Sequence, residues 1–409
     1  MIPLRFVEAK GAPLIEPAIT TLGNPDAQGI ILEVASESPT AVESGTGIVW
    51  VLRHDEVNRI ALDQRTVGVG LEMFDLMGID DGPLRDWYGS LMFTTEGPTH
   101  VRLRRLVNRA FTPRSTAALR DSTGVIVAEI YAQIVADGGG DLIQAFRQLP
   151  MKVMCRLLGV PEDDSGIFGD WVDALSPTFG FMEPTQVNDA SEAIGHLLDY
   201  MRKLADERRG APSDDLITHL LSAEEDGDRL THEELVAMVA NLLVGGHDTT
   251  SSQIGCTLLT LLRNPDALDI IRESRDQVGA VVSETMRLEP SITAIPRTVS
   301  QKMEVGKLQR APGTVLLLSL TAANRDPAVW DDAESFLPMR FADPDVPKLL
   351  SFGMGPHVCL GTHLARMTLD HVALGLAEHD LRLSGSPDEV EWKVVLGRSP
   401  STLEVEVGQ

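Results

Sequence analysis

Cysteine and positive charge are both scarce in this chain. Three cysteines occur among 409 residues, at positions 155, 256 and 359, which is too few and too scattered for a disulfide framework. A reducing, cytoplasmic setting is therefore expected. Lysine and arginine number 35 against 60 acidic residues, which gives a formal net charge of −25. This balance argues against non-specific binding to nucleic acid or to an anionic membrane, and an acidic surface commonly serves solubility.

A long hydrophobic run is also missing. The N-terminal stretch MIPLRFVEAKGAPLIEP lacks the continuous apolar segment of a signal peptide. Uncharged runs such as residues 311–324 are shorter than the ~20 residues that a membrane span requires. The sequence therefore predicts a soluble protein without a membrane anchor.

The sequence contains no internal repeat, low-complexity tract or Gly/Ser-rich linker, so we expect a single domain over residues 1–409. Its first part, about 1–97, contains two short strands around a Gly-Thr-Gly turn, a helix at 54–63 and a long irregular stretch at 66–96. Helical periodicity dominates the second part, about 98–409. The expected fold class is mainly α with small β-sheets.

One predicted helix is much longer than the others. It runs over residues 231–263, from the capping box of Thr231 and Glu234 to Asn264-Pro265. Such a helix is about 50 Å long, and its apolar middle predicts burial on nearly every side. The stretch NLLVGGHDTTSS at 241–252 nevertheless puts two glycines and several polar residues there. Each glycine costs a helix roughly 1 kcal/mol relative to alanine, so the most hydrophobic helix is weakened midway.

A second unusual stretch is SFGMGPHVCLGTHLARM at 351–367. Its glycines permit positive φ and a close approach of the backbone to a flat ligand. Cys359 precedes a helix, whose free N–H groups and dipole stabilise a thiolate, and such a thiolate is a good axial ligand for haem iron. A buried, inert cysteine is the usual alternative. A zinc site with His357 and His363 lacks a fourth ligand.

The pattern F-G-x-G-x-H-x-C-x-G resembles the haem-binding loop of the cytochrome P450 family. Its fixed positions are Phe352, Gly353, Gly355, His357, Cys359 and Gly361, a spacing that ordinary composition rarely produces by chance. The resemblance extends in order over nearly the whole chain. It implies a triangular prism with the long central helix over a haem b, whose iron is bound by Cys359. It also implies a monooxygenase that inserts one oxygen atom of O2 into a C–H bond.

The family's E-x-x-R element matches Glu284 and Arg287, which share one helix face. The motif alone is not specific, because Glu56 and Arg59 also match it, as expected for a surface pair. What distinguishes residues 284–287 is their position before the cysteine loop and before F-L-P-M-R-F, whose Arg340 joins the pair in the family. The resemblance therefore implies a structural ionic network of Glu284, Arg287 and Arg340, which specifies the fold more than it stabilises it.

Haem carries two propionates that need cationic partners. His100 and Arg104 match the family's H-x-x-x-R, and Arg297 and His357 match its other two propionate contacts. Charge-assisted hydrogen bonds to carboxylates explain these residue types.

The glycine pair of the central helix acquires a role through the same resemblance, since G-G-H-D-T-T is similar to the family's (A/G)-G-x-(D/E)-T. Gly245 and Gly246 would leave room beside the iron for O2 and substrate. Asp248 would relay protons from the solvent side, and Thr249 would hold a hydrogen bond at the distal oxygen. Local weakening of the helix ladder would let Thr249 or water take a hydrogen bond there.

Electrons are expected from a separate protein, because no fused reductase follows Cys359. The resemblance implies a [2Fe-2S] or similar ferredoxin with an NAD(P)H-dependent reductase. Residues 100–114 carry five arginines and no acid, which would steer an acidic partner, although some of these arginines face haem. No nucleic-acid or membrane partner is expected, and the protein is expected to be a monomer.

The resemblance also places three segments around the substrate, at 71–93, at 176–187 and in the strand after the E-x-x-R helix. The candidate pocket side chains are Phe74, Phe93, Phe179, Phe181, Ile292, Ala294 and Ile295. They indicate an apolar small molecule such as a terpenoid, steroid, fatty acid or aromatic compound, although loop aromatics more often pack than line a pocket.

Two other functions stay open at this point. A peroxygenase on the same fold would use hydrogen peroxide directly, but the family's peroxide users typically lack the acid–alcohol pair that Asp248 and Thr249 supply. A non-catalytic haem-binding sensor or carrier would have no need for a proton relay.

Overall fold

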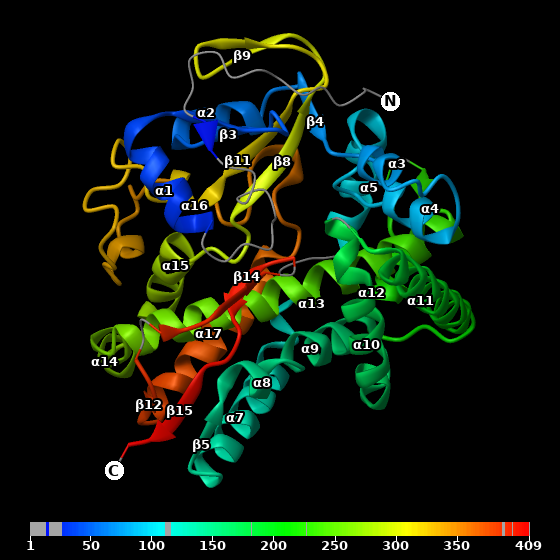
Figure 1. Cartoon of the computed structure of the whole chain (residues 1–409). Helices are drawn as coiled ribbons and strands as arrows, with labels where there is room; N and C mark the ends of the chain where they lie inside the picture. The colour runs from blue at the N-terminus through cyan, green and yellow to red at the C-terminus, as the bar shows by residue number, and fades with distance from the viewer. Residues whose placement is uncertain are drawn as a thin grey trace.

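The computed structural model describes residues 14–15, 27–110, 116–180, 182–225, 227–386, 389–394 and 396–408. These form a mainly helical molecule with small sheets, as predicted (Figure 1). The helices of this part are α1 (Ala27–Glu37), α2 (His54–Ala61), α3 (Glu72–Leu76), α4 (Pro83–Gly89), α5 (Gly97–Ala110), α7 (Arg120–Ala136), α8 (Leu142–Phe146), α9 (Leu149–Leu158), α10 (Ser165–Leu175), α11 (Pro184–Gly210), α12 (Leu216–Ser222), α13 (His232–Arg263), α14 (Asp266–Glu273), α15 (Val278–Leu288), α16 (Leu320–Ala323) and α17 (Thr362–Glu378).

The largest sheet has the strand order β1-β2-β3-β11-β8-β4. Its strands are β1 (Leu14–Ile15), β2 (Thr40–Glu43), β3 (Val49–Val51), β4 (Thr66–Gly68), β8 (Ala294–Val299) and β11 (Val315–Ser319). In β3, Val49 and Val51 pack into one apolar cluster while Trp50 packs into another, because successive strand residues point to opposite faces. The sheet lies with α1, α2 and α16 at one end of the molecule (Figure 1).

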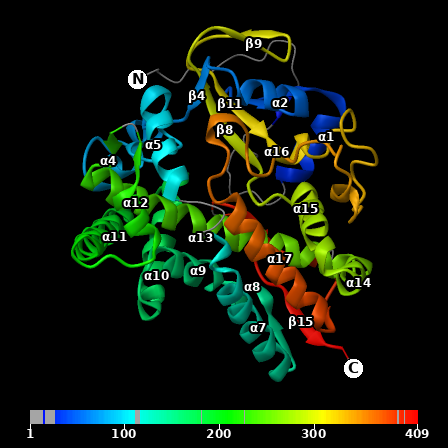
Figure 2. The same cartoon turned by 180° about the vertical axis from the view of Figure 1, so that it is seen from behind.

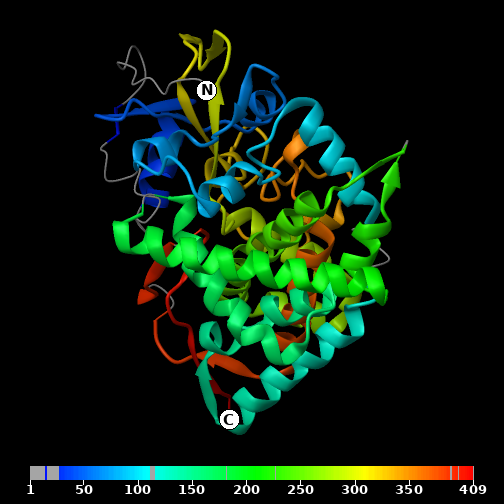
Figure 3. The ribbon, with the colours of Figure 1, turned by 90° about the vertical axis from the view of Figure 1, so that its right-hand side faces the viewer.

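Smaller sheets complete the β structure of the described residues. They are β5 (Gly139–Asp141) with β12 (Leu381–Leu383) and β15 (Glu404–Val407), and the pairs β6 (Glu224–Glu225) with β7 (Asp228–Arg229), β9 (Met303–Val305) with β10 (Leu308–Arg310), and β13 (Trp392–Val394) with β14 (Arg398–Pro400). The three-stranded sheet lies beside α7 at the end of the molecule opposite the large sheet (Figures 1 and 3).

Helix α13 crosses the middle of the molecule and packs against α9, α10, α11, α15 and α17 (Figures 1 and 2). Its start is fixed as predicted, because Thr231 and Glu234 form the capping box and Asn264 follows its last residue. The helix is continuous through the glycine pair, so the expected weakening produces no break. The expected burial on nearly every side holds for its C-terminal half, but Gly245 is exposed and Asp248 and Thr249 are partly exposed.

The stretch 66–96 is more ordered than predicted. It contains β4 and the short helices α3 and α4. Leu84, Trp87 and Tyr88 of α4 are buried in the helical core together with Phe74 of α3. Leu84, Trp87 and Tyr88 have the i, i+3, i+4 spacing of a helix face. Glycines near both ends of α3 and of α4 obscure this pattern in the sequence.

Among the described residues, no helix is both long enough and apolar enough to cross a membrane. The end of the arginine-rich stretch 100–114, from residue 111 onward, lies outside the described residues.

Candidate active site

The cysteine loop, residues 351–361, directly precedes α17. Its backbone turns at Gly353 (φ 71°) and Gly355 (φ 69°), conformations that favour glycine. A Cβ at Gly355 would lie 2.8 Å from Cδ2 of Leu62, the residue that follows α2, so the loop also packs closely against the end of this helix. The backbone N–H of Cys359 donates to the carbonyl of Phe352 at 2.8 Å. The loop thereby presents Cys359 two residues before the N-cap of α17.

Cys359 is an exposed, free cysteine. Desolvation by its surroundings raises the pKa of the thiol, while hydrogen bonds from the Gly361 N–H and from Thr362 and the charge of Arg104 oppose this rise. The N-terminal groups of α17 therefore act on the sulfur in the direction that favours a thiolate.

Four predicted propionate contacts meet beside this loop. The imidazole rings of His100 and His357 lie 4.2 Å apart between centroids. His357 Nε2 is 3.1 Å from Glu96 Oε2, and Arg297 Nη1 donates to Glu96 Oε1 at 3.3 Å. Arg104 lies one helical turn after His100, and its charge acts on both His100 and Cys359. Helix α5, strand β8 and the cysteine loop thus converge on one point.

The chemistry of this cluster fits a dianionic group. Arg297 Nε and His100 Nε2 are buried without a hydrogen-bond partner in the described part of the chain. Burial lowers the pKa values of Arg104, Arg297 and His100, and the charge of Glu96 offsets this effect only in part at Arg297 and His100. Two propionates would satisfy these groups, so the residues present fit haem.

Glu96 is the residue that the sequence analysis missed here. Its Oε1 accepts hydrogen bonds from the Gly68 N–H at 2.7 Å and from Arg297. Glu96 lies directly before α5, four residues before His100. An acidic residue at this i, i+4 spacing from a predicted propionate contact is the sequence signal that could have identified it.

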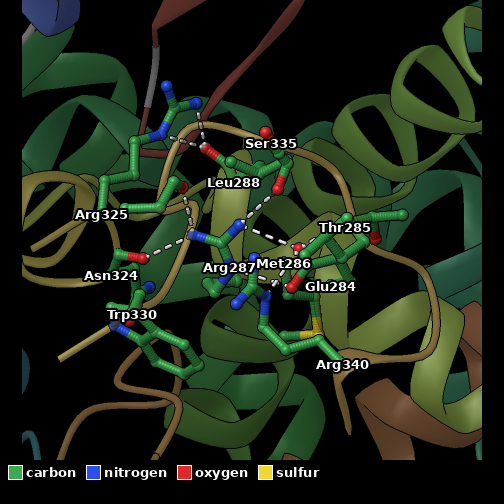
Figure 4. A network of polar contacts seen from close by, with 12 residues as sticks. Glu284, Thr285, Met286, Arg287, Leu288, Asn324, Arg325, Trp330, Ser335 and Arg340 are labelled. Carbon is green, nitrogen blue, oxygen red and sulfur yellow. Dashed lines mark hydrogen bonds and ion pairs between the residues drawn. The ribbon is translucent and has the colours of Figure 1, made fainter. Parts of the chain in front are cut away.

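The E-x-x-R pair is buried at the centre of a polar network (Figure 4). Arg287 donates to both carboxylate oxygens of Glu284, and its other donor atoms reach the carbonyls of Asn324, Ala333 and Ser335. Arg340 Nε donates to Glu284 Oε1 at 3.2 Å. The second match, Glu56 and Arg59, is a partly exposed surface pair, as expected.

The two glycines of α13 have different surroundings. A Cβ at Gly245 would meet no atom within 4 Å, whereas one at Gly246 would lie 2.8 Å from Met154 Sδ on α9. Of the two glycines, only Gly245 borders open space. The expectation that Gly246 also leaves room for O2 and substrate is wrong, because Gly246 instead allows α13 to pack closely against α9.

The polar pair follows directly on the same helix. Thr249 Oγ1 donates to the Gly245 carbonyl at 2.7 Å, so Thr249 does take a hydrogen bond within the helix ladder. Burial raises the pKa of Asp248 to about 6. Ser291, which precedes β8, donates to the Thr249 carbonyl at 3.3 Å, and this contact ties α13 to the strand that carries Arg297.

The candidate pocket side chains separate into two groups. Phe93 is 41% exposed and its ring lies 5.8 Å from that of Phe179. Ile292, Ala294 and Ile295 are partly exposed, and Ile295 lies against Gly353 of the cysteine loop. Phe74 is not with them, since it is fully buried against Tyr88, with 4.6 Å between ring centroids; its aromatic ring fills the core. Phe181 lies outside the described residues.

The basic stretch 100–114 offers less free charge than its composition suggests. Arg102 forms ion pairs with Asp228 and Glu234 at 2.6 and 2.7 Å. Arg104 belongs to the cluster around Cys359. Arg114 lies outside the described residues.

Comparisons with known proteins agree with this arrangement. Residues 167–384 match the family model described as cytochrome P450. Cytochrome P450 107B1 of Saccharopolyspora erythraea is 35% identical over 325 residues, which cover 78% of this chain and 78% of the relative. Vitamin D(3) 25-hydroxylase of Pseudonocardia autotrophica is 34% identical over 325 residues, again 78% of each chain. The crystal structure of CalO2 is similar with a TM-score of 0.86 at 27% identity, covering 94% of this chain and 96% of that one.

Proposed function

The chain belongs to the cytochrome P450 family and is a monooxygenase, and from this membership we propose that it hydroxylates an apolar small molecule with O2 and with electrons from a separate ferredoxin. The proposed cofactor is haem b. The proposed substrate is a terpenoid, steroid, fatty acid or aromatic compound. The observation that carries the proposal is the group of desolvated cations beside Cys359, where buried nitrogen atoms of His100 and Arg297 have no partner among the described residues.

In this proposal the chain holds haem at two places. Cys359 binds the iron as a thiolate, and the hydrogen bond from Gly361 together with the charge of Arg104 favours that thiolate. His100, Arg104, Arg297 and His357 bind the propionates by charge-assisted hydrogen bonds. Phe352 and Gly353 form the part of the loop that faces the haem plane.

When bound, haem supplies the iron centre that activates O2 and delivers one oxygen atom to the substrate. Gly245 would leave room beside the bound haem, because no atom lies within 4 Å of where its Cβ would be. Asp248 holds a proton on its carboxylate, and its pKa of about 6 lets it gain and lose that proton near neutral pH. Thr249, whose hydroxyl donates to the Gly245 carbonyl, would orient the hydrogen bond by which Asp248 passes this proton on.

The apolar side of the proposed pocket consists of Phe93, Phe179, Ile292, Ala294 and Ile295. Partly exposed apolar side chains favour an apolar ligand, because its binding removes their surface from water. Vitamin D(3) in the name of one relative is compatible with a substrate of steroid-like size and polarity. Polar substituents of the substrate would need partners from other residues.

Ferredoxin docking is proposed for the face that carries α5 and the cysteine loop. The arginine-rich stretch 100–114 gives this face its positive character. The predictions of one domain over residues 1–409, of a monomer and of a cytoplasmic location accompany the proposal. The pairing of β3 with β11 and of β4 with β8, which joins the two parts of the chain, is what a single domain requires.

The test has three measurements on the haem-loaded protein. The carbon monoxide difference spectrum of the reduced protein should show the red-shifted Soret band of a thiolate ligand, and its absence would refute the assignment of Cys359. A panel of terpenoids, steroids, fatty acids and aromatics should include compounds that shift the haem spin state. With such a compound, O2 consumption should require ferredoxin and its reductase. Turnover with hydrogen peroxide alone would identify a peroxygenase instead.

A further inference from the structure

A cavity of about 300 Å³ lies beside the middle of α13. Its wall combines three segments: the end of α8, the end of α10, and the C-terminal strands β13 and β14. The charged and polar residues that line it include Arg147, Asp173, Ser176, His247, Asp248, Lys393 and Ser401. A cavity with so many polar partners is suited to hold water.

His247 connects two carboxylates of this cavity. Its Nε2 lies 3.7 Å from Asp173 Oδ1 and 4.0 Å from Asp248 Oδ1. Its side chain is only 3% exposed, while that of Asp173 is 37% exposed. The imidazole therefore stands between an acid that reaches solvent and an acid that faces the interior.

Hydrogen bonding leaves one oxygen of Asp248 for this contact. Ser176 donates its hydroxyl hydrogen bond to Oδ2 of Asp248, so Oδ1 is the atom that faces His247. The imidazole Nε2 lies 4.0 Å from that oxygen. A proton can therefore pass from Nε2 to Oδ1 once the two atoms approach to hydrogen-bond distance.

The electrostatic surroundings of Asp173 favour its anionic form. Burial raises the pKa of Asp173, but its contact with His247 and the charge of Arg147 outweigh this effect and lower the pKa. Asp173 thus stays ionised beside His247. The charges that act on Asp248 come from His247, Asp173, Arg147 and Lys393.

We propose that His247 is the proton donor to Asp248 and that Asp173 positions it. In each cycle the imidazolium gives its Nε2 proton to Asp248 Oδ1, which leaves a neutral imidazole and a neutral carboxylic acid. Water of the cavity then returns a proton to Nε2 and draws its own replacement from bulk solvent. The proposal rests on the proposed role of Asp248 and adds the route by which its proton arrives.

The competing route is direct transfer from cavity water to Asp248, which also lines the cavity. The resting protein distinguishes the two without turnover. The infrared band of the protonated Asp248 carboxyl, identified by its loss in Asp248→Asn, should titrate near pH 6. In His247→Gln the midpoint should move up, because a positive neighbour is lost. In Asp173→Asn it should move down, because a negative neighbour is lost. Unchanged midpoints in both variants would overturn the proposal.

Turnover supplies the second measurement. His247→Gln should lower the ratio of product to NADPH consumed by about tenfold or more, the scale of lost general acid catalysis, and raise the solvent isotope effect on product formation. Asp173→Asn should change both in the same direction to a smaller extent. Ser401→Ala, in the same cavity wall, is the matched control and should leave both unchanged. An unaltered isotope effect in His247→Gln would show direct transfer from water.

The two proposals fail in distinguishable ways. If no compound supports turnover, the infrared midpoints still decide whether His247 and Asp248 are coupled. If turnover proceeds normally in His247→Gln, the monooxygenase assignment stands and the relay is refuted.

Discussion

Arg287 donates from Nε and Nη2 to the two carboxylate oxygens of Glu284, each at 2.8 Å, in a pair whose side chains are completely buried. The chain offers a matched comparison in Glu56 and Arg59. They have the same i, i+3 spacing and a contact of 2.6 Å, but the Arg59 side chain is 43% exposed. Burial is therefore the variable that separates the two pairs.

Arg287→Ala should lower the free energy of unfolding by about 3–5 kcal/mol, because it removes the bidentate partner of the buried Glu284 carboxylate and leaves only Arg340 to compensate its charge. Arg59→Ala should lower it by less than about 1 kcal/mol, since water screens the surface pair. Chemical denaturation of the haem-loaded protein measures both. Equal losses would contradict the view that burial makes the Glu284 pair structural.

Glu96→Gln removes the one carboxylate that contacts Arg297 and His357 among the described residues. Loss of a negative charge beside the haem makes reduction of the iron easier. The reduction potential should rise by tens of millivolts, the order expected for one charge at an effective dielectric constant of ~20. Spectroelectrochemical titration checks this, with the exposed Glu404→Gln as a control. An unchanged potential would place Glu96 far from the cofactor.

Alanine substitutions should separate the two glycines of α13. Gly245→Ala should stabilise the protein by about 1 kcal/mol through helix propensity, while slowing the binding of carbon monoxide by narrowing the open space. Gly246→Ala forces a contact with Met154, and overpacking of about 1–3 kcal/mol cancels or exceeds the same gain. Thermal unfolding measures the stability of both variants, and carbon monoxide rebinding measures access to the iron. A Gly246→Ala variant that is more stable than Gly245→Ala would refute the packing role of Gly246.

The pKa of Asp248, about 6, makes stability depend on pH. The folded protein binds the proton more tightly than the unfolded chain, whose carboxyl has its ordinary pKa of 3.8. Stability therefore falls as pH rises from about 4 to about 6, and stays lower above that range. Asp248→Asn should remove this loss and stabilise the protein by up to about 3 kcal/mol at pH 7, with little effect below pH 4.

Asp370 is the control for this prediction, because burial raises its pKa to about 6 as well. Asp370→Asn should show the same pH-dependent stabilisation. Only Asp248→Asn should also lower the yield of product per NADPH. Denaturation at pH 4 and pH 7 together with product analysis tests both statements.

Thr249→Ala should uncouple NADPH consumption from product formation and release peroxide, because the hydroxyl that orients the proton is lost. Thr260 makes the same kind of bond on the same helix, donating to the Cys256 carbonyl at 2.8 Å. Thr260→Ala and Thr249→Ala should change the free energy of unfolding by a similar ~1 kcal/mol. Thr260→Ala should not uncouple NADPH consumption from product formation. Normal coupling in Thr249→Ala would remove Thr249 from the proposed mechanism.

The sequence by itself determined the features that depend on spacing along the chain. The capping box at Thr231 fixed the start of α13, and the Gly-Thr-Gly turn located β2 and β3. The cysteine loop and the E-x-x-R helix were identifiable because each works through residues within ten positions of one another. Local hydrogen bonds and strand or helix periodicity follow from backbone geometry alone.

Tertiary structure decided which distant side chains meet. Asp173 and His247 are 74 positions apart, and Glu96 and His357 are 261 apart, so no periodicity links them. The different surroundings of Gly245 and Gly246 follow from where α9 packs on α13, and the burial of Phe74 follows from its contact with Tyr88. Such contacts depend on how whole elements fill the core at close-packed density, a property of the assembled fold that no local pattern encodes.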